Sequence, residues 1–125
     1  RFLAERFTGA VQHVAFRTED IFKTAVGMQE RGFEPLEMTE NYYHDLQARF
    51  SINDENLTRM KALNILYDED QDGALYQLYG KPFAGALFFE IVQRIDQCDG
   101  YGAANAPFRI VAQKRLMRPK GMPSK

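Results

Sequence analysis

The architecture of this chain follows from the run Ala86-Leu87-Phe88-Phe89-Glu90-Ile91-Val92-Gln93-Arg94, which predicts a buried strand with one carboxylate in its interior. A second strand-like run, Val11-Gln12-His13-Val14-Ala15-Phe16-Arg17, carries one imidazole in the same way. Each group needs a partner, because burying it alone is costly. One His and one Glu are two thirds of the ligand set that holds non-heme Fe(II). We expect the other histidine, His44, on the surface of a short helix, so the third ligand is not evident in this chain.

Alternation along the strand places Glu90 on the same face as Phe88, on the more polar side that we expect to line a cup. The opposite face should be the core covered by helices. Two other interpretations stay open from the residues alone. Glu90 could form a structural ion pair with Arg94 or Arg17, and His13 could be a core histidine bonded to a backbone carbonyl.

Composition narrows the class of protein. A chain of 125 residues suffices for one domain with a core. A net charge of −1 gives no electrostatic case for binding nucleic acid or an anionic membrane. No run reaches the roughly 20 apolar residues that span a bilayer, and no signal peptide is visible. Cys98 is the single cysteine, which fits a reducing, cytoplasmic location. The start at Arg1, without Met, suggests a piece of a longer protein.

Periodicity and turn residues predict the order strand, helix, strand, three further strands and a helix. Thr18 is the expected N-cap of the first helix, and Asn53 or Asp54 that of a later one. The acidic stretch 68–73 is predicted as a hairpin turn, because an EF-hand loop would need Glu where Tyr79 stands. The predicted elements are a strand at 11–17, a helix at 19–31, an extended piece at 33–36, a helix or pair of turns at 40–50, a helix at 54–63, strands at 64–68, 74–79 and 86–95, and a helix at 106–118.

Several segments, taken together, resemble 4-hydroxyphenylpyruvate dioxygenases. Residues 9–21, Gly9-Ala10-Val11-Gln12-His13-Val14-Ala15-Phe16-Arg17-Thr18-Glu19-Asp20-Ile21, resemble the second metal-histidine segment of that family. The strand Leu87-Phe88-Phe89-Glu90-Ile91-Val92-Gln93-Arg94 resembles the strand of its metal glutamate. Between and after them, in the family's order, come Tyr42-Tyr43-His44-Asp45-Leu46, Leu75-Tyr76-Gln77-Leu78-Tyr79-Gly80-Lys81-Pro82 and Gly100-Tyr101-Gly102-Ala103-Ala104-Asn105.

The resemblance implies an α+β fold, a βαβββ vicinal-oxygen-chelate (glyoxalase/dioxygenase-like) half-barrel module with a C-terminal helix. The module would cover residues 11–118, after a lead-in at 1–10 and before a tail at 119–125. His13 and Glu90 would then hold Fe(II), or another divalent metal in its place. The third ligand would be a His of the preceding βαβββ module. We expect that module, or a second copy in a homo-oligomer, as a partner, because an open half-barrel exposes edge strands and an apolar face.

The same resemblance implies the ligands: an α-keto acid, or a related small aromatic or cyclic acid, and O2. Gln77 and Asn105 would orient polar groups, while Tyr79, Phe88 and Tyr101 would line the pocket. Alternation supports a common direction for the strand residues of this set, and it argues against Gln12, which should point away from His13.

The chain also departs from the dioxygenases. Asn105-Ala106-Pro107 stands where they have Asn-Phe, and Tyr79 stands where they have Phe. The segment 104–113 resembles another branch, in which a dioxygenase-like domain follows a sugar-isomerase-like barrel with 3-dehydroshikimate dehydratase activity. Three hypotheses follow: a metal-binding module of a dioxygenase, the tail domain of a bifunctional dehydratase, or a non-catalytic dimerisation module. In each case we expect the isolated chain to be inactive, because two protein ligands hold Fe(II) weakly.

Overall fold

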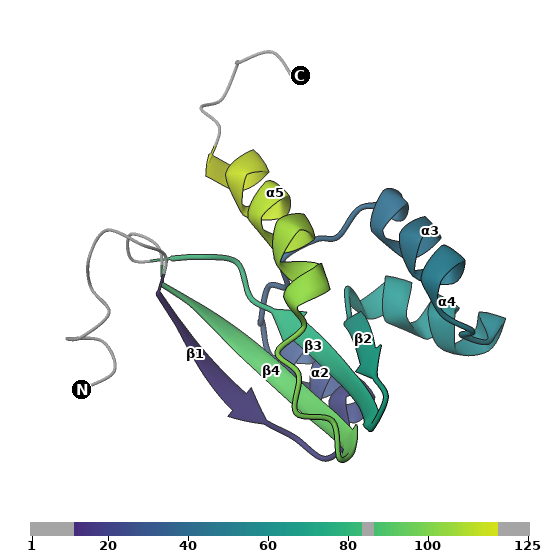
Figure 1. Cartoon of the computed structure of the whole chain (residues 1–125). Helices are drawn as coiled ribbons and strands as arrows, with labels where there is room; N and C mark the ends of the chain where they lie inside the picture. The colour runs from purple at the N-terminus through teal and green to yellow at the C-terminus, as the bar shows by residue number, and fades with distance from the viewer. Residues whose placement is uncertain (1–11, 84–86, 118–125) are drawn as a thin grey trace.

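The computed structural model describes residues 12–83 and 87–117 (Figure 1). The predicted lead-in at 1–10, the tail at 119–125, and the strand residues Val11 and Ala86 lie outside this part. The described elements are β1 (Gln12–Arg17), α2 (Ile21–Glu30), α3 (Glu40–Arg49), α4 (Asp54–Leu63), β2 (Leu66–Asp70), β3 (Gly73–Tyr79), β4 (Leu87–Asp96), the 3-10 turn η1 (Ala103–Asn105) and α5 (Ala106–Met117).

The strands form one mixed sheet in the order β1-β4-β3-β2. β1 runs parallel to β4, whereas β3 is antiparallel to both β4 and β2. The parallel pairing of β1 with β4 requires a long crossover between them, and α2, α3 and α4 lie in that connection. The register places Ala15 of β1 and Tyr79 of β3 on either side of Glu90. The predicted α+β class and βαβββ order are therefore confirmed.

The two faces of the sheet have different surroundings, as alternation predicted. α2 lies behind β3 and β4, whereas the segment that leads from β4 through η1 to the start of α5 lies in front of the sheet (Figure 1). Ile21 and Ala25 of α2 are fully buried with Leu78 and Ile91 in one core. Gln93 also faces α2, where its Oε1 accepts a hydrogen bond from the Ile21 amide at 2.9 Å. The other face is left for a cavity beneath α5.

The first helix begins later than the sequence predicted. Asp20, not Thr18, is its N-cap, and its side chain accepts a hydrogen bond from the Lys23 amide at 3.1 Å. The Thr18 amide still donates to the Val92 carbonyl of β4 at 2.9 Å, and its hydroxyl lies 2.8 Å from that of Thr24. The prediction was wrong because strand pairing extends one residue past β1.

Two other boundaries also differ. The extended piece at 33–36 is not a strand; it makes a single bridge, from Pro35 to Gly80. Proline has no amide hydrogen and cannot extend a ladder. α4 ends at Asn64, whose φ of 61° is left-handed, so the strand predicted from residue 64 starts at Leu66.

Hydrogen bonds from side chains to the backbone decide the remaining helix and turn predictions. Residues 40–49 form a helix rather than turns, with Thr39 as N-cap, and Asn53 caps α4. The acidic stretch is a hairpin turn, in which Asp70 Oδ1 accepts hydrogen bonds from the amides of Asp72 and Gly73, each at 2.9 Å. Within the described ranges, no helix is long and apolar enough to cross a membrane.

Candidate metal and ligand site

A cavity of about 640 Å³ lies on the sheet face that α2 does not cover. β1, β3 and β4 form its floor, and the loop before η1 and α5 form its roof. Alternate strand residues point into it, as predicted for a cup. The side chains that matter most below are those of His13, Gln77, Tyr79, Phe88, Glu90 and Arg109.

His13 and Glu90, from neighbouring parallel strands, meet in this cavity. His13 Nε2 lies 3.4 Å from Glu90 Oε1. The Glu90 side chain is 10% exposed and that of His13 is 47% exposed, so the pair has a buried and an open side. The His13 ring stacks on Phe88, with 5.2 Å between ring centres and 14° between planes. Among the described residues, Glu90 pairs with His13 and not with Arg17 or Arg94.

Gln77 holds the other oxygen of Glu90. Its Nε2 donates to Glu90 Oε2 at 2.8 Å, and it also lies 3.0 Å from the Tyr79 hydroxyl and 3.3 Å from the Tyr101 carbonyl oxygen. Gln77 is only 1% exposed, so these bonds are shielded from water. One carboxylate oxygen is therefore occupied by an amide donor, and the other is directed at His13.

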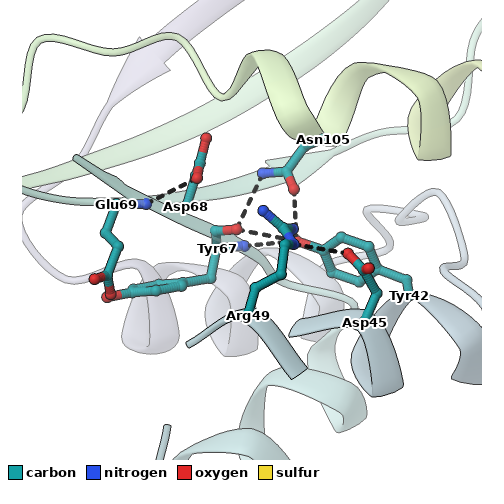
Figure 2. A network of polar contacts seen from close by, with 7 residues as sticks. All are labelled: Tyr42, Asp45, Arg49, Tyr67, Asp68, Glu69 and Asn105. Carbon is teal, nitrogen blue, oxygen red and sulfur yellow. Dashed lines mark hydrogen bonds and ion pairs between the residues drawn. The ribbon is translucent and has the colours of Figure 1, made fainter. Parts of the chain in front are cut away.

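A chain of hydrogen bonds continues from Gln77 into the core. Asn105 Nδ2 donates to Gln77 Oε1 at 2.8 Å, and the Tyr42 hydroxyl donates to Asn105 Oδ1 at 2.8 Å. The Tyr42 hydroxyl also accepts the Tyr67 amide at 2.9 Å, and Asn105 Nδ2 lies 3.3 Å from the Tyr67 carbonyl (Figure 2). Asn105 and Tyr42 are fully buried. Burial raises the pKa of Tyr42, so its phenol keeps the proton that it donates.

Both amide orientations follow from the two ends of this chain. The Glu90 carboxylate can only accept, so Gln77 must turn its NH2 toward it and its oxygen toward Asn105. The Tyr67 amide can only donate, so the Tyr42 proton is available to the Asn105 oxygen at 2.8 Å, which is nearer than the Tyr67 carbonyl oxygen at 3.2 Å. The network therefore occupies Oε2 of Glu90 and leaves Oε1, beside His13, available to a ligand.

Gly102 explains why the loop before α5 is rich in glycine. Its φ is 70°, and a Cβ there would collide with the Gln77 side-chain amide. Gly102 thus allows the loop to cover Gln77 closely.

The predicted pocket residues take different positions. Tyr79 and Phe88 are buried walls of the cavity. Tyr101 is 83% exposed at the rim, and it reaches the network through its carbonyl oxygen. Asn105 lies behind Gln77 and away from the cavity lining. The ligand-binding roles of these residues, like the metal-binding roles of His13 and Glu90, stay predictions.

Arg109 of α5 is a cavity residue that sequence reasoning missed. Its guanidinium carbon lies 5.1 Å from the Phe88 ring centre and 5.7 Å from that of Tyr79. Burial, followed by the Glu90 charge, raises the pKa of Tyr79, and the Arg109 charge offsets part of this rise. Strand alternation could not find Arg109, because it enters from a helix above the sheet. Tyr42 was also missed, although it belongs to a segment noted for its resemblance.

The donor set is suited to a divalent metal but is incomplete. Imidazole and carboxylate together bind iron, manganese or zinc. Two ligands that are each about 2.1 Å from one ion lie about 3 to 3.5 Å apart, which agrees with the 3.4 Å between His13 and Glu90. Within residues 12–83 and 87–117, no group of three or more His, Cys, Asp or Glu could hold a metal ion. A complete site would need a further ligand.

Comparison with known proteins identifies relatives of this chain. No family model matches it. It is 42% identical to a 3-dehydroshikimate dehydratase of Pseudomonas aeruginosa over 94% of this chain and 19% of that protein. It is 39% identical to a probable 4-hydroxyphenylpyruvate dioxygenase of Aspergillus fumigatus over 92% of this chain and 30% of that protein. The chain thus spans between about a fifth and a third of these curated relatives.

Solved structures agree with these relatives. A xylose isomerase-like TIM barrel/4-hydroxyphenylpyruvate dioxygenase fusion protein matches with a TM-score of 0.81 and 41% identity, over 86% of this chain and 17% of the other. A mutant of 4-hydroxymandelate synthase from Streptomyces coelicolor matches with a TM-score of 0.74 and 28% identity, over 86% of this chain and 30% of the other. Over most of its length the chain is therefore a homologue of the 4-hydroxyphenylpyruvate dioxygenases and of a segment of the 3-dehydroshikimate dehydratases.

Proposed function

We propose that this chain is the metal-binding module of a non-heme Fe(II), α-keto acid dioxygenase-like protein, in which His13 and Glu90 are two of three protein ligands. The observation that carries the proposal is the 3.4 Å approach of His13 Nε2 to Glu90 Oε1 inside the cavity. The 2.8 Å bond from Gln77 to Glu90 Oε2 supports it, because metal-binding carboxylates are commonly oriented by such partners. A bound divalent metal would supply a Lewis acid for an α-keto acid and a redox centre for O2.

The residues of the chain would position the reactants. His13 and Glu90 present their donor atoms on one side of the cavity, and Gln77 keeps the carboxylate in one orientation. Tyr79 and Phe88 provide an apolar wall against which a small acid can lie. These groups bind and orient; no described side chain is assigned a proton transfer.

We further propose that the third ligand and the other half of the cup come from a preceding βαβββ module of a longer protein. β1 is an edge strand of the sheet, and the His13 side chain is 47% exposed beside it. The chain also covers only 19% and 30% of two relatives, so their whole activities need more than this module. A second copy of the chain is the alternative source of the missing half.

The second candidate function is the dioxygenase-like domain of a bifunctional 3-dehydroshikimate dehydratase. The 42% identity with the Pseudomonas aeruginosa dehydratase exceeds the 39% found with the Aspergillus fumigatus dioxygenase. In that case the dehydration would take place outside this chain. The cavity would bind a metal for a separate reaction, or the module would serve only in assembly.

Fe(II) binding tests the proposal. Calorimetry under argon on the purified chain, with His13→Ala, Glu90→Gln and the exposed control His44→Ala, should show a weak site that only the control retains. Binding that survives His13→Ala or Glu90→Gln would contradict the assignment of the ligands. If the wild-type chain binds no Fe(II), the same variants in the longer protein decide the question. Loss of bound iron there supports the metal module, and iron content that both substitutions leave unchanged contradicts the assignment of the ligands.

A further inference from the structure

The cavity contains more positive charge than its own residues balance. Three arginines line it, Arg17, Arg94 and Arg109, against one carboxylate, Glu90. Among the described residues, none of these arginines forms an ion pair. The whole chain has a net charge of −1, so the positive charge is a local property of the cavity. A concave site of one sign attracts ligands of the opposite sign.

Of the three arginines, Arg109 is the one held in place within the cavity. Its Nη1 donates to Gln113 Oε1 at 3.0 Å, and Gln113 is only 5% exposed. The rings of Phe88 and Tyr79 flank its guanidinium group. Several of its five N–H donors are left for a ligand. A group positioned in this way loses little entropy when it binds.

The other two arginines lie toward the opposite end of the strands. Arg17 is the last residue of β1 and is exposed. Arg94 lies beyond Glu90 on β4, and its Nη2 donates to the Gly100 carbonyl at 3.2 Å. They add positive potential at the rim, but neither has the aromatic contacts of Arg109.

Arg109 also lies close to the paired His13 and Glu90. The ring of Phe88 contacts both groups: the His13 ring centre is 5.2 Å from it, and the Arg109 guanidinium carbon is 5.1 Å from it. One aromatic ring thus separates the candidate metal ligands from a fixed cation. Both groups line the same cavity.

We propose that the ligand of this cavity is a small dianionic α-keto acid, whose second carboxylate binds the guanidinium of Arg109. The inference rests on the proposed metal site for the α-keto end of the ligand. Arginine suits the second end because its planar fork binds a carboxylate through two hydrogen bonds. An acid with an uncharged tail would leave a partly buried guanidinium without a counter-charge, which is unfavourable.

Two acids of the same shape test the proposal. 2-Oxoglutarate ends in a carboxylate, and 5-methyl-2-oxohexanoate has two methyl groups in place of its two terminal oxygens. Dissociation constants are measured by calorimetry on the Fe(II)-loaded chain under argon. The wild-type chain should bind 2-oxoglutarate about 10- to 100-fold more tightly, the range for hydrogen bonds to charged groups.

Variants on α5 then show which residue causes the preference for 2-oxoglutarate. Arg109→Gln should remove this preference by lowering the affinity for 2-oxoglutarate and not that for 5-methyl-2-oxohexanoate, and Arg109→Lys should keep part of the preference. Arg115→Gln, an exposed arginine of the same helix, is the matched control and should have no effect. Amide spectra of each variant verify that it is folded. A wild-type chain that binds both acids equally, or neither, overturns the proposal, as does a preference that survives Arg109→Gln.

The two proposals can fail separately. Loss of Fe(II) binding in His13→Ala with no preference between the acids supports the metal site and overturns the role of Arg109. If the chain binds no Fe(II), glutarate is titrated into the metal-free chain. A shift of the Arg109 Nε–H signal in the wild type, assigned by its absence from the spectrum of Arg109→Gln, then supports the anion site alone. The lack of such a shift overturns it.

Discussion

Tyr42→Phe removes one hydroxyl from the centre of the buried network and leaves two polar groups without their partner. The Tyr67 amide loses its acceptor at 2.9 Å, and Asn105 Oδ1 loses its donor at 2.8 Å. The site is fully buried, since Tyr42 and Asn105 are both 0% exposed. Each buried polar group that loses its partner costs about 1 to 3 kcal/mol. We therefore expect the free energy of unfolding to fall by about 2 to 4 kcal/mol.

Tyr43→Phe is the matched control, because the neighbouring tyrosine is also buried. Its hydroxyl donates to the Ile65 carbonyl at 2.9 Å, so the substitution deprives only one carbonyl of a donor. We expect a loss of about 1 kcal/mol there. Urea unfolding followed by circular dichroism measures both values. The corresponding difference in melting temperature is roughly 4 °C for each kcal/mol in a domain of this size.

The same pair of variants tests whether the network acts on the site. Without the Tyr42 hydroxyl, the Asn105 amide loses one of the partners that hold it, and its support of Gln77 against Glu90 is weaker. Fe(II) affinity should fall in Tyr42→Phe and stay unchanged in Tyr43→Phe. If Tyr42→Phe costs no more than its neighbour, the described network does not carry the stability assigned to it.

Three further outcomes are expected. Gln77→Ala should weaken Fe(II) binding by about 10- to 100-fold, since it removes the partner of Glu90. Gln93→Ala, on the opposite face of the sheet, should leave Fe(II) binding unchanged, and equal effects of the two variants in calorimetry would disprove this prediction. Hydrogen bonds from backbone amides, and chiefly that of Asp72, lower the pKa of Asp70. The stability that the Asp70 carboxylate adds should be present above about pH 4 and lost as the pH falls through its lowered pKa. In urea unfolding, the difference in stability between wild type and Asp70→Asn should therefore shrink in acid; a constant difference would contradict this. Burial, with a contribution from Asp70, raises the pKa of Cys98, so iodoacetamide should alkylate the native thiol more slowly than the thiol in urea; equal rates would contradict the burial.

Much of the site was predictable because strand geometry is local. Alternation with a period of two placed Glu90 and His13 on one face of their strands, and the parallel pairing of β1 with β4 brought them within 3.4 Å. The same rule correctly directed Gln77, Tyr79 and Phe88 into one cavity. Helix ends with clear capping residues were also predictable, because each cap depends on a few neighbouring residues.

Other features depend on contacts between distant segments. Thr18 is not the cap of the first helix, because strand pairing with β4 continues through its amide. The position of Asn105 behind Gln77 depends on how η1 packs against the sheet. None of these outcomes follows from the local pattern.

The linear pattern of residues thus accounts for the strand order, the cup-facing side chains and the candidate metal pair, since these follow from alternation and resemblance. The buried route from Tyr42 to Glu90 and the position of Arg109 above the sheet required the folded chain. Both depend on how α3 and α5 pack against β2, β3 and β4, over separations of up to 63 residues in the case of Tyr42 and Asn105. Such contacts are selected by the shape and hydrogen bonding of the complete core, which no local stretch specifies.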